Sequence, residues 1–368
     1  MNKPKRILHI VGAMNRAGTE TMLMNIYRNI DREKIQFDFI SYSHQDAHYD
    51  EEISRLGGKV IKLTNTQSIK QIVQAIRRNG PYIAVHSHTL FHCGTANIAA
   101  KLAGIPIRIA HAHTTLDHSD SVIRKVYIRL MRNIIMNVST HYLACSKQAG
   151  HYLFGQKGVN KPVFHFFPNL IDYAHFLEVE QDRVEHFKEE AGLQGYKVIG
   201  HIGRFIEAKN HRFLLDILKH IVSKDPKWKL LLVGDGDLRD QIEERAKTER
   251  LGNHIVFVGV RSDIPTMLHS MDVFVFPSIY EGLGLVLLEA QASGVPCIVS
   301  EAVQPEADLN INLVSKLSLE DSADVWANKV LSIIGKREEE KGKIINGFKK
   351  SGYEFEKGIF KLMKLYEV

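Results

Sequence analysis

Two glutamates, Glu281 and Glu289, stand eight residues apart in a stretch that is otherwise strongly apolar, FPSIYEGLGLVLLEAQASGVPCIVS over residues 276–300. A carboxylate buried among such neighbours costs roughly several kcal/mol unless it accepts hydrogen bonds, so both acids need partners. The hydroxyl groups of a bound carbohydrate would supply such partners, and so would arginine side chains inside the protein. The stretch therefore indicates either a site for a polyhydroxylated ligand or a buried helix with internal ion pairs.

The residues around these glutamates predict a strand, a sharp turn and a helix. Residues 272–278 form an apolar run typical of a buried strand, and Gly282 and Gly284 let the chain turn sharply into the helix that follows. A helix that starts at the carboxyl end of a parallel strand presents free backbone N–H groups, which favour an anion and above all a phosphate. We therefore expect a nucleotide sugar here, with its phosphates on the N–H groups and its hydroxyls on the glutamates.

A basic loop, residues 203–210, follows another predicted strand, KVIGHI. Arg204 could reach a diphosphate with its planar guanidinium and Lys209 with its point charge, although either residue alone is also typical of surface charge. The triplet Asp235-Gly236-Asp237 has the D-x-D spacing with which many metal-dependent enzymes hold a cation and a diphosphate. It directly ends the apolar run KLLLVG, where Asp-Gly is ordinary turn chemistry, so we favour a turn.

Two histidines, His111 and His113, end the strand-like run IRIA. Strand alternation places both side chains on the same face if the strand continues that far. The carboxyl end of a strand in an α/β unit is where ligands bind, so a ligand contact and a satisfied structural role are both open. A metal pair is disfavoured, because no acid or third histidine stands at a supporting distance along the sequence.

Strand-like and helix-like segments alternate along both halves of the chain. Its 368 residues are too many for one ordinary core and suggest about two domains. Repeated strand-then-helix order predicts parallel sheets covered by helices on both faces. The turn-rich FPNLID marks the boundary, which gives a first domain over residues 1–169, a second over 170–353 and a last helix over 354–368. We expect an α/β protein with two Rossmann-like, doubly wound domains that face each other across a cleft.

Charge is divided unevenly between the two halves. Residues 1–169 carry 22 Lys and Arg against 10 Asp and Glu, whereas the rest of the chain carries 26 against 32. The helix predicted over residues 121–142 has a basic arc beside an apolar arc, and Ile128 and Ile135 fall within the basic arc. The basic arc consists of Arg124, Lys125, Arg129 and Arg132. Such a surface suits an anionic bilayer, and it is also typical of the solvated face of an ordinary amphipathic helix.

Several classes of protein are disfavoured. No apolar run approaches the ~18 residues needed to cross a bilayer, and the apolar stretch near the start is too short for a signal peptide. The three cysteines show no disulfide or metal pattern, and zinc-finger spacings, RNA-recognition strands and a dinucleotide fingerprint after the first strand are absent. We therefore expect a cytoplasmic protein, at most peripheral on the inner membrane face, that binds neither nucleic acid nor a dinucleotide.

Taken together, several motifs resemble the retaining glycosyltransferases of family 4. They are Gly203-Arg204, Lys209-Asn210, VGDG, Gly259 followed by Arg261 and Asp263, and P-S-x-x-E-G-x-G-L-x-x-L-E-A with G-x-P-x-x-x-S. The resemblance is strongest over residues 196–300 and weaker over 6–170. The run IRIAHAHTT and the region after Ser300 also resemble the bacterial capsular and exopolysaccharide branch.

The resemblance implies a GT-B fold, a donor held mainly by the second domain, an acceptor held by the first, and no catalytic metal or cofactor. The expected reaction moves a hexose-type unit, with retention, from a nucleoside diphosphate sugar to an acceptor hydroxyl. The expected donor is a UDP-sugar, and the expected acceptor is a lipid-linked or other glycan in capsular, exopolysaccharide or cell-surface polysaccharide synthesis. A sugar-nucleotide epimerase of the same fold and a non-catalytic nucleotide-sugar-binding protein are the alternatives.

The resemblance also implies catalytic roles. Arg204 and Lys209 would neutralise the donor diphosphate as the glycosidic bond breaks, which is electrostatic stabilisation of a leaving group. Glu281 would face the donor sugar. His113, with His111 as the fallback, would lie near the reacting sugar.

The remaining implied roles are in donor binding. The backbone N–H groups of Gly282, Leu283, Gly284 and Leu285 would assist Glu281. Glu289 would hold the ribose hydroxyls, Arg261 would border the base, and Gly18 would belong to the loop that approaches the diphosphate.

Two departures from the family pattern weaken parts of this assignment. The first loop has Ala17 before Gly18 where the family normally has a glycine pair, and residues 302–304 lack the glycine pair that many members have before Pro305-Glu306. We therefore assign no role to Glu306.

Overall fold

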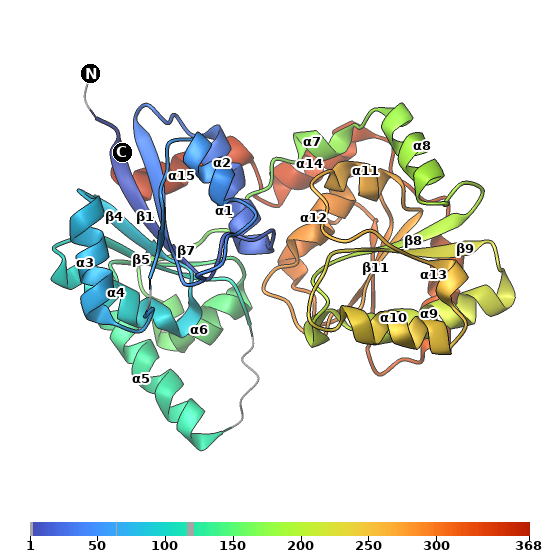
Figure 1. Cartoon of the computed structure of the whole chain (residues 1–368), viewed down its shortest axis with the longest axis horizontal. Coiled ribbons are helices and arrows are strands. Elements are labelled where there is room, and N and C mark those ends of the chain that lie inside the picture. Colours follow the sequence, from blue (N-terminus) through green and yellow to red (C-terminus); the bar gives the residue numbers. More distant parts are fainter. Residues whose placement is uncertain (1–2, 64, 116–120) are drawn as a thin grey trace. The chain divides into compact units, whose positions relative to one another are not determined.

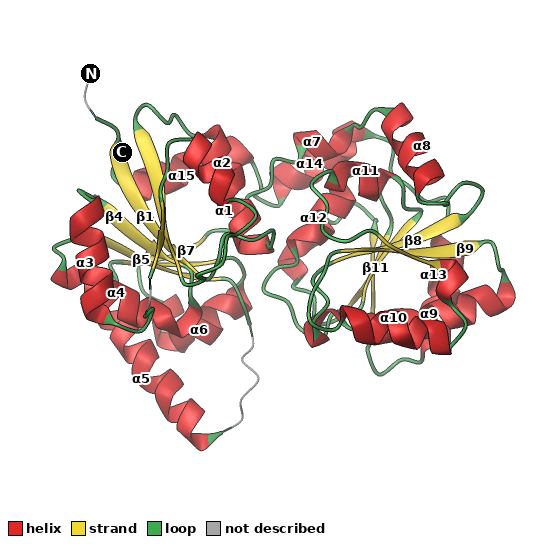
Figure 2. Ribbon diagram, viewed as in Figure 1, coloured by secondary structure: helices red, strands yellow, loops and turns green. Residues whose placement is uncertain are grey.

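The computed structural model describes residues 3–63, 65–115 and 121–368, and the chain divides into two compact units. Unit 1 contains residues 1–170 together with 354–368, and unit 2 contains residues 171–353. Each unit is built on one parallel β-sheet with helices on both faces (Figures 1 and 2). Both units are therefore Rossmann-like, and the predicted fold class is confirmed.

The sheet of unit 1 has seven parallel strands in the order β3-β2-β1-β4-β5-β6-β7. They are β1 (Lys5–Val11), β2 (Ile35–Ser41), β3 (Val60–Lys62), β4 (Ala84–Ser87), β5 (Ile107–Ala112), β6 (His141–Ala144) and β7 (Phe164–Phe166). The chain first adds strands on one side of β1 and then returns to add β4 to β7 on the other side. This reversal makes the edge between β1 and β4 the topological switch point, where folds of this type bind ligands.

Helices cover both faces of this sheet (Figure 1). One face carries α1 (Gly18–Asn29), α2 (Asp50–Arg55) and α15 (Phe355–Leu365), and the other carries α3 (Ile69–Asn79), α4 (Cys93–Leu102), α5 (Val122–Val138) and α6 (Lys147–Val159). Leu362 and Tyr366 are buried in the same core as α1 and the face of β1 that contains Ile7. The end of the chain is thus an integral part of unit 1.

Helix α5 is shorter than the helix expected over residues 121–142. It ends at Val138, and His141 already belongs to β6. The chain leaves the helix because Ser139 adopts extended backbone and the N–H of Thr140 donates to the carbonyl of Arg108 at 2.8 Å. None of the described helices is both long and apolar enough to cross a membrane.

The sheet of unit 2 has six parallel strands in the order β10-β9-β8-β11-β12-β13. They are β8 (Lys197–Ile202), β9 (Trp228–Val233), β10 (Ile255–Phe257), β11 (Val273–Phe276), β12 (Cys297–Ser300) and β13 (Val314–Leu317). Here the chain reverses between β8 and β11. The loops that follow these two strands therefore flank the switch point of unit 2.

The helices of unit 2 also form two layers (Figure 1). The layer of α9 (His211–Lys224), α10 (Arg239–Thr248) and α13 (Ala323–Ile333) buries one apolar core against the sheet. The opposite layer contains α7 (Ala174–Leu177), α8 (Gln181–Glu190), α11 (Ile264–His269), α12 (Leu285–Ala292) and α14 (Lys341–Lys350). Helix α12 carries Glu289 and begins directly after the loop that follows β11.

Candidate functional site

Lys209 and Glu281 meet at the switch point of unit 2. Lys209 follows β8 and Glu281 follows β11, and the Lys209 Nζ donates to Glu281 Oε1 at 2.5 Å although the residues are 72 positions apart. Their side chains are only 17% and 10% exposed. The ammonium group also lies 4.6 Å from the centre of the Phe276 ring. The partner of the first glutamate is therefore a lysine, and two residues with implied catalytic roles are in direct contact.

The chain between Glu281 and α12 presents backbone N–H groups to this switch point. Gly284 has φ +88°, a left-handed conformation that favours glycine, and it places Leu285 at the first position of the helix. Within the described part of the chain, the N–H groups of residues 282–285 donate no backbone hydrogen bond. Unsatisfied N–H groups at a helix start are suited to an anion.

Glu289 is buried on α12 without a polar partner for its carboxylate among the described residues. Burial raises the pKa of this carboxyl to about 7. The two glutamates thus differ, because Glu281 is ion-paired and Glu289 is not. Within the described part of the chain, Glu281 forms its ion pair with a lysine rather than with the arginine that the sequence left open.

The other predicted donor-site residues of unit 2 lie in two different environments. Arg204 is exposed, with no side-chain hydrogen bond or ion pair to another described residue. Arg261 donates two hydrogen bonds to the Asp263 carboxylate, at 2.8 and 2.7 Å, and its guanidinium lies 5.7 Å from the centre of the Phe187 ring. Arg261 is therefore held within unit 2, whereas Arg204 is available to a ligand.

The D-x-D triplet forms a turn. The Asp235 carboxylate accepts a hydrogen bond from the N–H of Gly236 at 2.8 Å, which is local turn chemistry. A Cβ atom at Gly234 would lie 2.1 Å from the carbonyl oxygen of Gly203, so the chain after β9 passes directly against the loop after β8. The VGDG motif therefore shapes the loop that carries Arg204.

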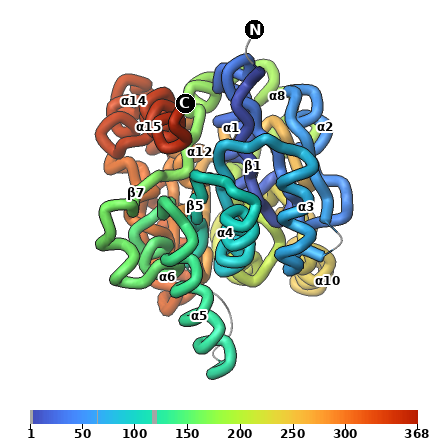
Figure 3. The backbone as a smooth tube through the Cα atoms, turned by 90° about the vertical axis from the view of Figure 1, so that its left-hand side faces the viewer, coloured from blue at the N-terminus to red at the C-terminus, as the bar shows by residue number. Residues whose placement is uncertain are grey.

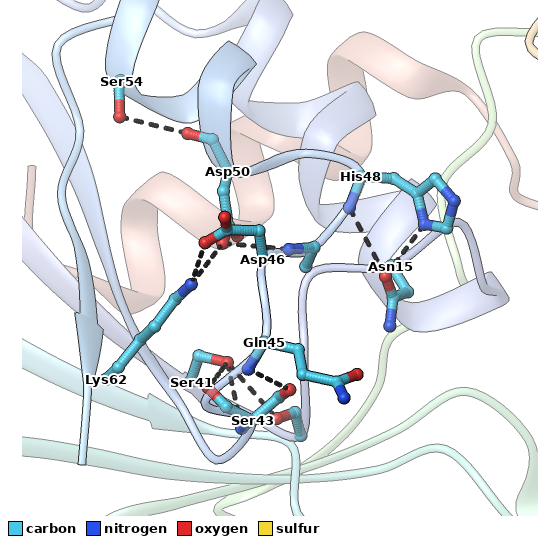
Figure 4. A network of polar contacts seen from close by, with 11 residues as sticks. Asn15, Ser41, Ser43, Gln45, Asp46, His48, Asp50, Ser54 and Lys62 are labelled. Atoms are coloured by element: carbon cyan, nitrogen blue, oxygen red, sulfur yellow. Dashed lines mark hydrogen bonds and ion pairs between the residues drawn. The ribbon is translucent and has the colours of Figure 1, made fainter.

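In unit 1, Gly18 is the first residue of α1. The preceding loop is tied to the loop after β2, because Asn15 Oδ1 accepts hydrogen bonds from the backbone N–H of His48 at 3.4 Å and from its Nδ1 at 2.8 Å (Figure 4). The loop after β2 is held in turn by Lys62, which pairs with Asp46 and with Asp50 at 2.5 and 3.3 Å. These contacts fix the loop that leads into Gly18.

A cluster of five histidines occupies the switch point of unit 1. We call it the histidine cluster, and it consists of His9 on β1, His86 and His88 at the end of β4, and His111 and His113 at the end of β5. The register places His9 opposite His86, and the rings of His111 and His113 lie on the same face with centres 3.9 Å apart. The expectation that no third histidine supports the pair is wrong, because neighbouring strands bring three more.

The cluster contains a directed chain of hydrogen bonds. Asn169 Oδ1 accepts from His113 Nδ1 at 3.2 Å, so His113 Nε2 is free to accept from His88 Nδ1 at 2.9 Å. His88 Nε2 then accepts from His9 Nδ1 at 3.1 Å. This direction leaves His9 Nε2 as a buried lone pair without a partner in the described structure. The carbonyl of Asn169 thereby sets the tautomer of three rings.

The other two rings form a second branch of the histidine cluster. His86 Nδ1 lies 2.7 Å from the Tyr366 hydroxyl and His86 Nε2 lies 3.1 Å from His111 Nδ1. Burial lowers the pKa of His113 to about 4 and that of His9 to about 3, and it lowers the pKa of His86, His88 and His111 well below the usual value. All five rings are therefore neutral at pH 7.

Sequence reasoning missed His9, His86, His88, Asn169 and Tyr366. One signal was present, since HSH over residues 86–88 repeats the alternation of HAH over residues 111–113 in two consecutive predicted strands. Consecutive strands of an α/β unit usually lie side by side, which would have placed four of the rings together.

Two Rossmann-like parallel-sheet units are the architecture of the GT-B glycosyltransferases, the class that the sequence motifs imply. A family model described as Glycosyltransferase Family 4 matches residues 16–175, and one described as Glycosyl transferases group 1 matches residues 182–350. The protein EpsF of Bacillus subtilis strain 168, named as a glycosyltransferase, is 37% identical over 99% of this chain and 97% of its own length. The chain belongs to glycosyltransferase family 4.

Two further proteins are informative. An Escherichia coli enzyme named UDP-Gal:alpha-D-GlcNAc-diphosphoundecaprenol alpha-1,3-galactosyltransferase is 27% identical over 73% of this chain and 72% of its own length. The crystal structure of Anabaena HepE in complex with UDP and glucose superposes with a TM-score of 0.80 at 18% identity, covering 98% of both chains, and shows the shared fold. Family membership makes the chain a glycosyltransferase, in agreement with the predicted enzyme class.

The raised pKa of Glu289 predicts a pH-dependent stability. In the unfolded chain a glutamate has a pKa of about 4.3, so the folded protein binds this proton more tightly. The stabilisation is complete below pH ~4.3 and is lost as the pH rises through about 7. We expect Glu289→Gln to match the wild type at low pH and to exceed its free energy of unfolding at pH 8 by on the order of 3 kcal/mol.

Denaturant unfolding across this pH range measures the difference. Glu320→Gln, which changes an exposed glutamate of the same unit, is the matched control and should leave the pH dependence unchanged. Parallel pH profiles for the wild type and Glu289→Gln would contradict the assignment.

Proposed function

We propose that the chain is a retaining, metal-independent transferase that moves a hexose-type unit from a UDP-sugar to a hydroxyl of a lipid-linked glycan. The product would enter capsular, exopolysaccharide or other cell-surface polysaccharide. One observation carries the donor side of this proposal. Among the residues that the structure describes, the switch point of unit 2 combines the buried Lys209–Glu281 pair, N–H groups of residues 282–285 that donate no backbone hydrogen bond, and a buried Glu289 without a polar partner.

The charge arrangement suits a diphosphate that becomes more negative as its bond to the sugar breaks. Lys209 already lies in a site with little solvent, where its field is stronger than in water. Arrival of the diphosphate gives this ammonium a second anionic partner, and Arg204 adds a mobile cation at the rim. Glu281 can then turn an oxygen to a hydroxyl of the donor sugar, beside N–H groups that bind phosphate oxygens.

Glu289 suits the ribose of the nucleotide. A buried carboxylate without donors is costly, and two ribose hydroxyls would supply the missing hydrogen bonds. Ribose binding would stabilise the ionised form and so lower the pKa of Glu289 from its raised value. Arg261 is proposed to border the base, in the orientation that its hydrogen bonds to Asp263 impose.

Known proteins support the choice of substrates. HepE was crystallised with UDP and glucose, and the E. coli relative is named for UDP-Gal and a diphosphoundecaprenol-linked acceptor. For His113 and Gly18 we propose the family roles, a contact to the reacting sugar and an approach to the diphosphate.

Retention follows from attack on the face from which the diphosphate departs. The bond from the anomeric carbon to the diphosphate oxygen breaks and a bond to the acceptor oxygen forms. The acceptor proton passes to the departing phosphate oxygen, so no protein nucleophile and no metal takes part in the balance.

Removal of Lys209 or Glu289 tests the donor site. We expect Lys209→Ala to lower kcat/KM by about 10²–10³-fold, because a donor aimed at the developing charge is lost. Glu289→Ala should weaken UDP binding, which calorimetry measures, and should lower kcat/KM as well. Lys219→Ala, an exposed ion-paired lysine on α9, is the matched control and should behave like the wild type.

Loss of Lys209 leaves Glu281 buried and unpaired, so thermal melting of each variant must accompany the assays. Glu281→Gln in the Lys209→Ala background restores a neutral site for that comparison. Near-wild-type turnover in both Lys209→Ala and Glu289→Ala would remove the donor-site assignment.

Metal independence predicts that transfer continues in excess chelator. Fixed cations perform the neutralisation that a metal performs in other transferases, so EDTA should not lower the initial rate. Loss of activity in EDTA that Mg²⁺ restores would instead revive Asp235 and Asp237 as metal ligands.

We also propose that α5 docks unit 1 on an anionic membrane surface. The exposed apolar side chains of α5 belong to its apolar arc, on which Val122, Ile123, Val126 and Leu130 lie. In the basic arc, by contrast, Ile135 is buried and Ile128 is half-buried. Val122, Ile123, Val126 and Leu130 are 75%, 82%, 63% and 57% exposed. An ordinary amphipathic helix would bury this arc against its own domain. The N-terminal half of α5 instead extends beyond its neighbours in unit 1 (Figures 1 and 3).

Cations accompany these apolar side chains. Lys125 and Arg129 are exposed on the same helix, whereas Arg132 is half-buried and donates to the carbonyls of Tyr152 and Leu153 at 2.6 and 3.3 Å. Lys125 and Arg129 could therefore meet anionic headgroups while the apolar arc enters the interface.

Vesicle sedimentation tests this surface. The protein should bind phosphatidylglycerol vesicles at low salt and phosphatidylcholine vesicles much less. Ile123→Gln with Val126→Gln should weaken binding at least about tenfold, because two side chains no longer enter the interface. Leu102→Gln changes another exposed apolar residue of unit 1 and should have no effect. Absence of binding to anionic vesicles at low salt would end the proposal.

A further inference from the structure

We propose that the histidine cluster of unit 1 is a binding site for one transition-metal ion of the Zn²⁺ type, held by His88, His111 and His113. One ligand nitrogen from each ring is available, and these atoms lie within 4.8 Å of one another. The donor chemistry proposed for unit 2 uses no metal, although this site shares His113 with the proposed contact to the reacting sugar.

Strand register brings the three ligands together. Ser87 of β4 pairs with Ala110 of β5, so His88 stands level with His111 at the next position. His113 follows two residues later on the same face of the sheet. Three imidazoles therefore converge where β4 and β5 end, because His111 lies on β5 while His88 and His113 directly follow β4 and β5.

The chemistry of the ligands selects the class of ion. The histidine cluster offers two overlapping groups of ligands in the described chain, and both contain histidines only. Imidazole suits Zn²⁺, Ni²⁺ and Cu²⁺, whereas Mg²⁺ and Mn²⁺ prefer oxygen ligands. Three histidines with one remaining position for water are a known arrangement for Zn²⁺.

The present distances are close to those of such a site. His88 Nδ1 and His113 Nε2 are 2.9 Å apart, and two ligands of a tetrahedral Zn²⁺ at about 2.0–2.1 Å would be about 3.3–3.4 Å apart. The ion would take the place of the hydrogen between these two nitrogens. The distance between them would then increase by only about a few tenths of an ångström. His111 Nε2 is buried without a polar partner in the described structure, so a third ligand atom is uncommitted.

The hydrogen-bond chain can absorb the displaced hydrogen. When His88 Nδ1 binds the ion, its hydrogen moves to Nε2 and is donated to His9 Nδ1. The hydrogen of His9 then moves to its own Nε2, which has no other partner among the described residues. The three rings stay neutral, so the only charge added to the site is that of the ion itself.

Access favours this group over the second group, His9, His86 and His88. His9 and His86 are fully buried, whereas His88 and His113 are half-buried and leave a route for the ion. If His113 contacts the reacting sugar, as the proposed function holds, a bound ion would inhibit transfer. That consequence rests on the proposed function, whereas ion binding does not.

Co²⁺ is the probe, because a tetrahedral Co²⁺ site absorbs visible light far more strongly than the hydrated ion. The chelator-treated full chain is titrated with Co²⁺, and Zn²⁺ is then added. We expect absorption that saturates near one equivalent and disappears with Zn²⁺. His88→Gln and His111→Gln should each weaken binding by more than about tenfold.

One variant is the matched control. His165→Gln removes a partly buried histidine from β7 of the same sheet and should retain the absorption. Melting in EDTA identifies any variant that does not fold. The wild-type titration decides independently of the variants, since no absorption at micromolar protein overturns the site.

Retention of the absorption in both His88→Gln and His111→Gln would overturn the ligand assignment. Saturating Zn²⁺ should lower the transfer rate at least about tenfold, and an unchanged rate would overturn the inhibitory role alone. If the purified chain shows no transfer with any donor, the proposed function fails, yet the Co²⁺ titration still tests the metal site.

Discussion

The candidate sites depend on one constraint of parallel sheets. All strands of such a sheet end at the same edge, and at a switch point the two neighbouring connections leave in opposite directions. In unit 2 this opening lies between β8 and β11, and in unit 1 it lies between β1 and β4. Polar groups that face such an opening cannot form the backbone hydrogen bonds that join neighbouring strands. They must satisfy one another or be satisfied by a ligand.

The two units meet this constraint with different chemistry. Unit 2 places one buried charge pair there, Lys209 with Glu281, and leaves Glu289 with no partner in the described structure. A buried ion pair adds little to stability because its desolvation offsets its attraction. The proposed function gives this pair a role in binding, since a diphosphate and a sugar would share the lysine and the glutamate between them. Unit 1 instead uses neutral rings, whose burial costs far less than that of a charge.

The sequence supported the fold class because the alternation of apolar runs and helical segments is strong in both units. The sequence also allowed Glu281, Glu289 and Lys209 to be named as candidate site residues, because the two glutamates are unusual in such apolar surroundings and Lys209 lies in a basic loop that follows a predicted strand. It could not show that Lys209 pairs with Glu281, because 72 residues separate them and only the strand order brings them together. The end of α5 was misjudged for a similar reason: Thr140 leaves the helix to bond to Arg108, a residue of the neighbouring strand.

The full histidine cluster could not be predicted from the sequence, because its members come together only through long-range strand pairing. His9, His86 and His88 each occur in apolar strands where a single histidine is ordinary. Only the order β1-β4-β5 makes them neighbours of His111 and His113. Apolar side chains at these buried positions would cost less free energy of folding than histidines, since each buried polar atom without a partner costs about 1–3 kcal/mol. Two such atoms, His9 Nε2 and His111 Nε2, persist among the described residues. A cation that prefers imidazole would accept the lone pair of His111 Nε2 and so recover part of that cost, while His9 Nε2 would carry the displaced hydrogen.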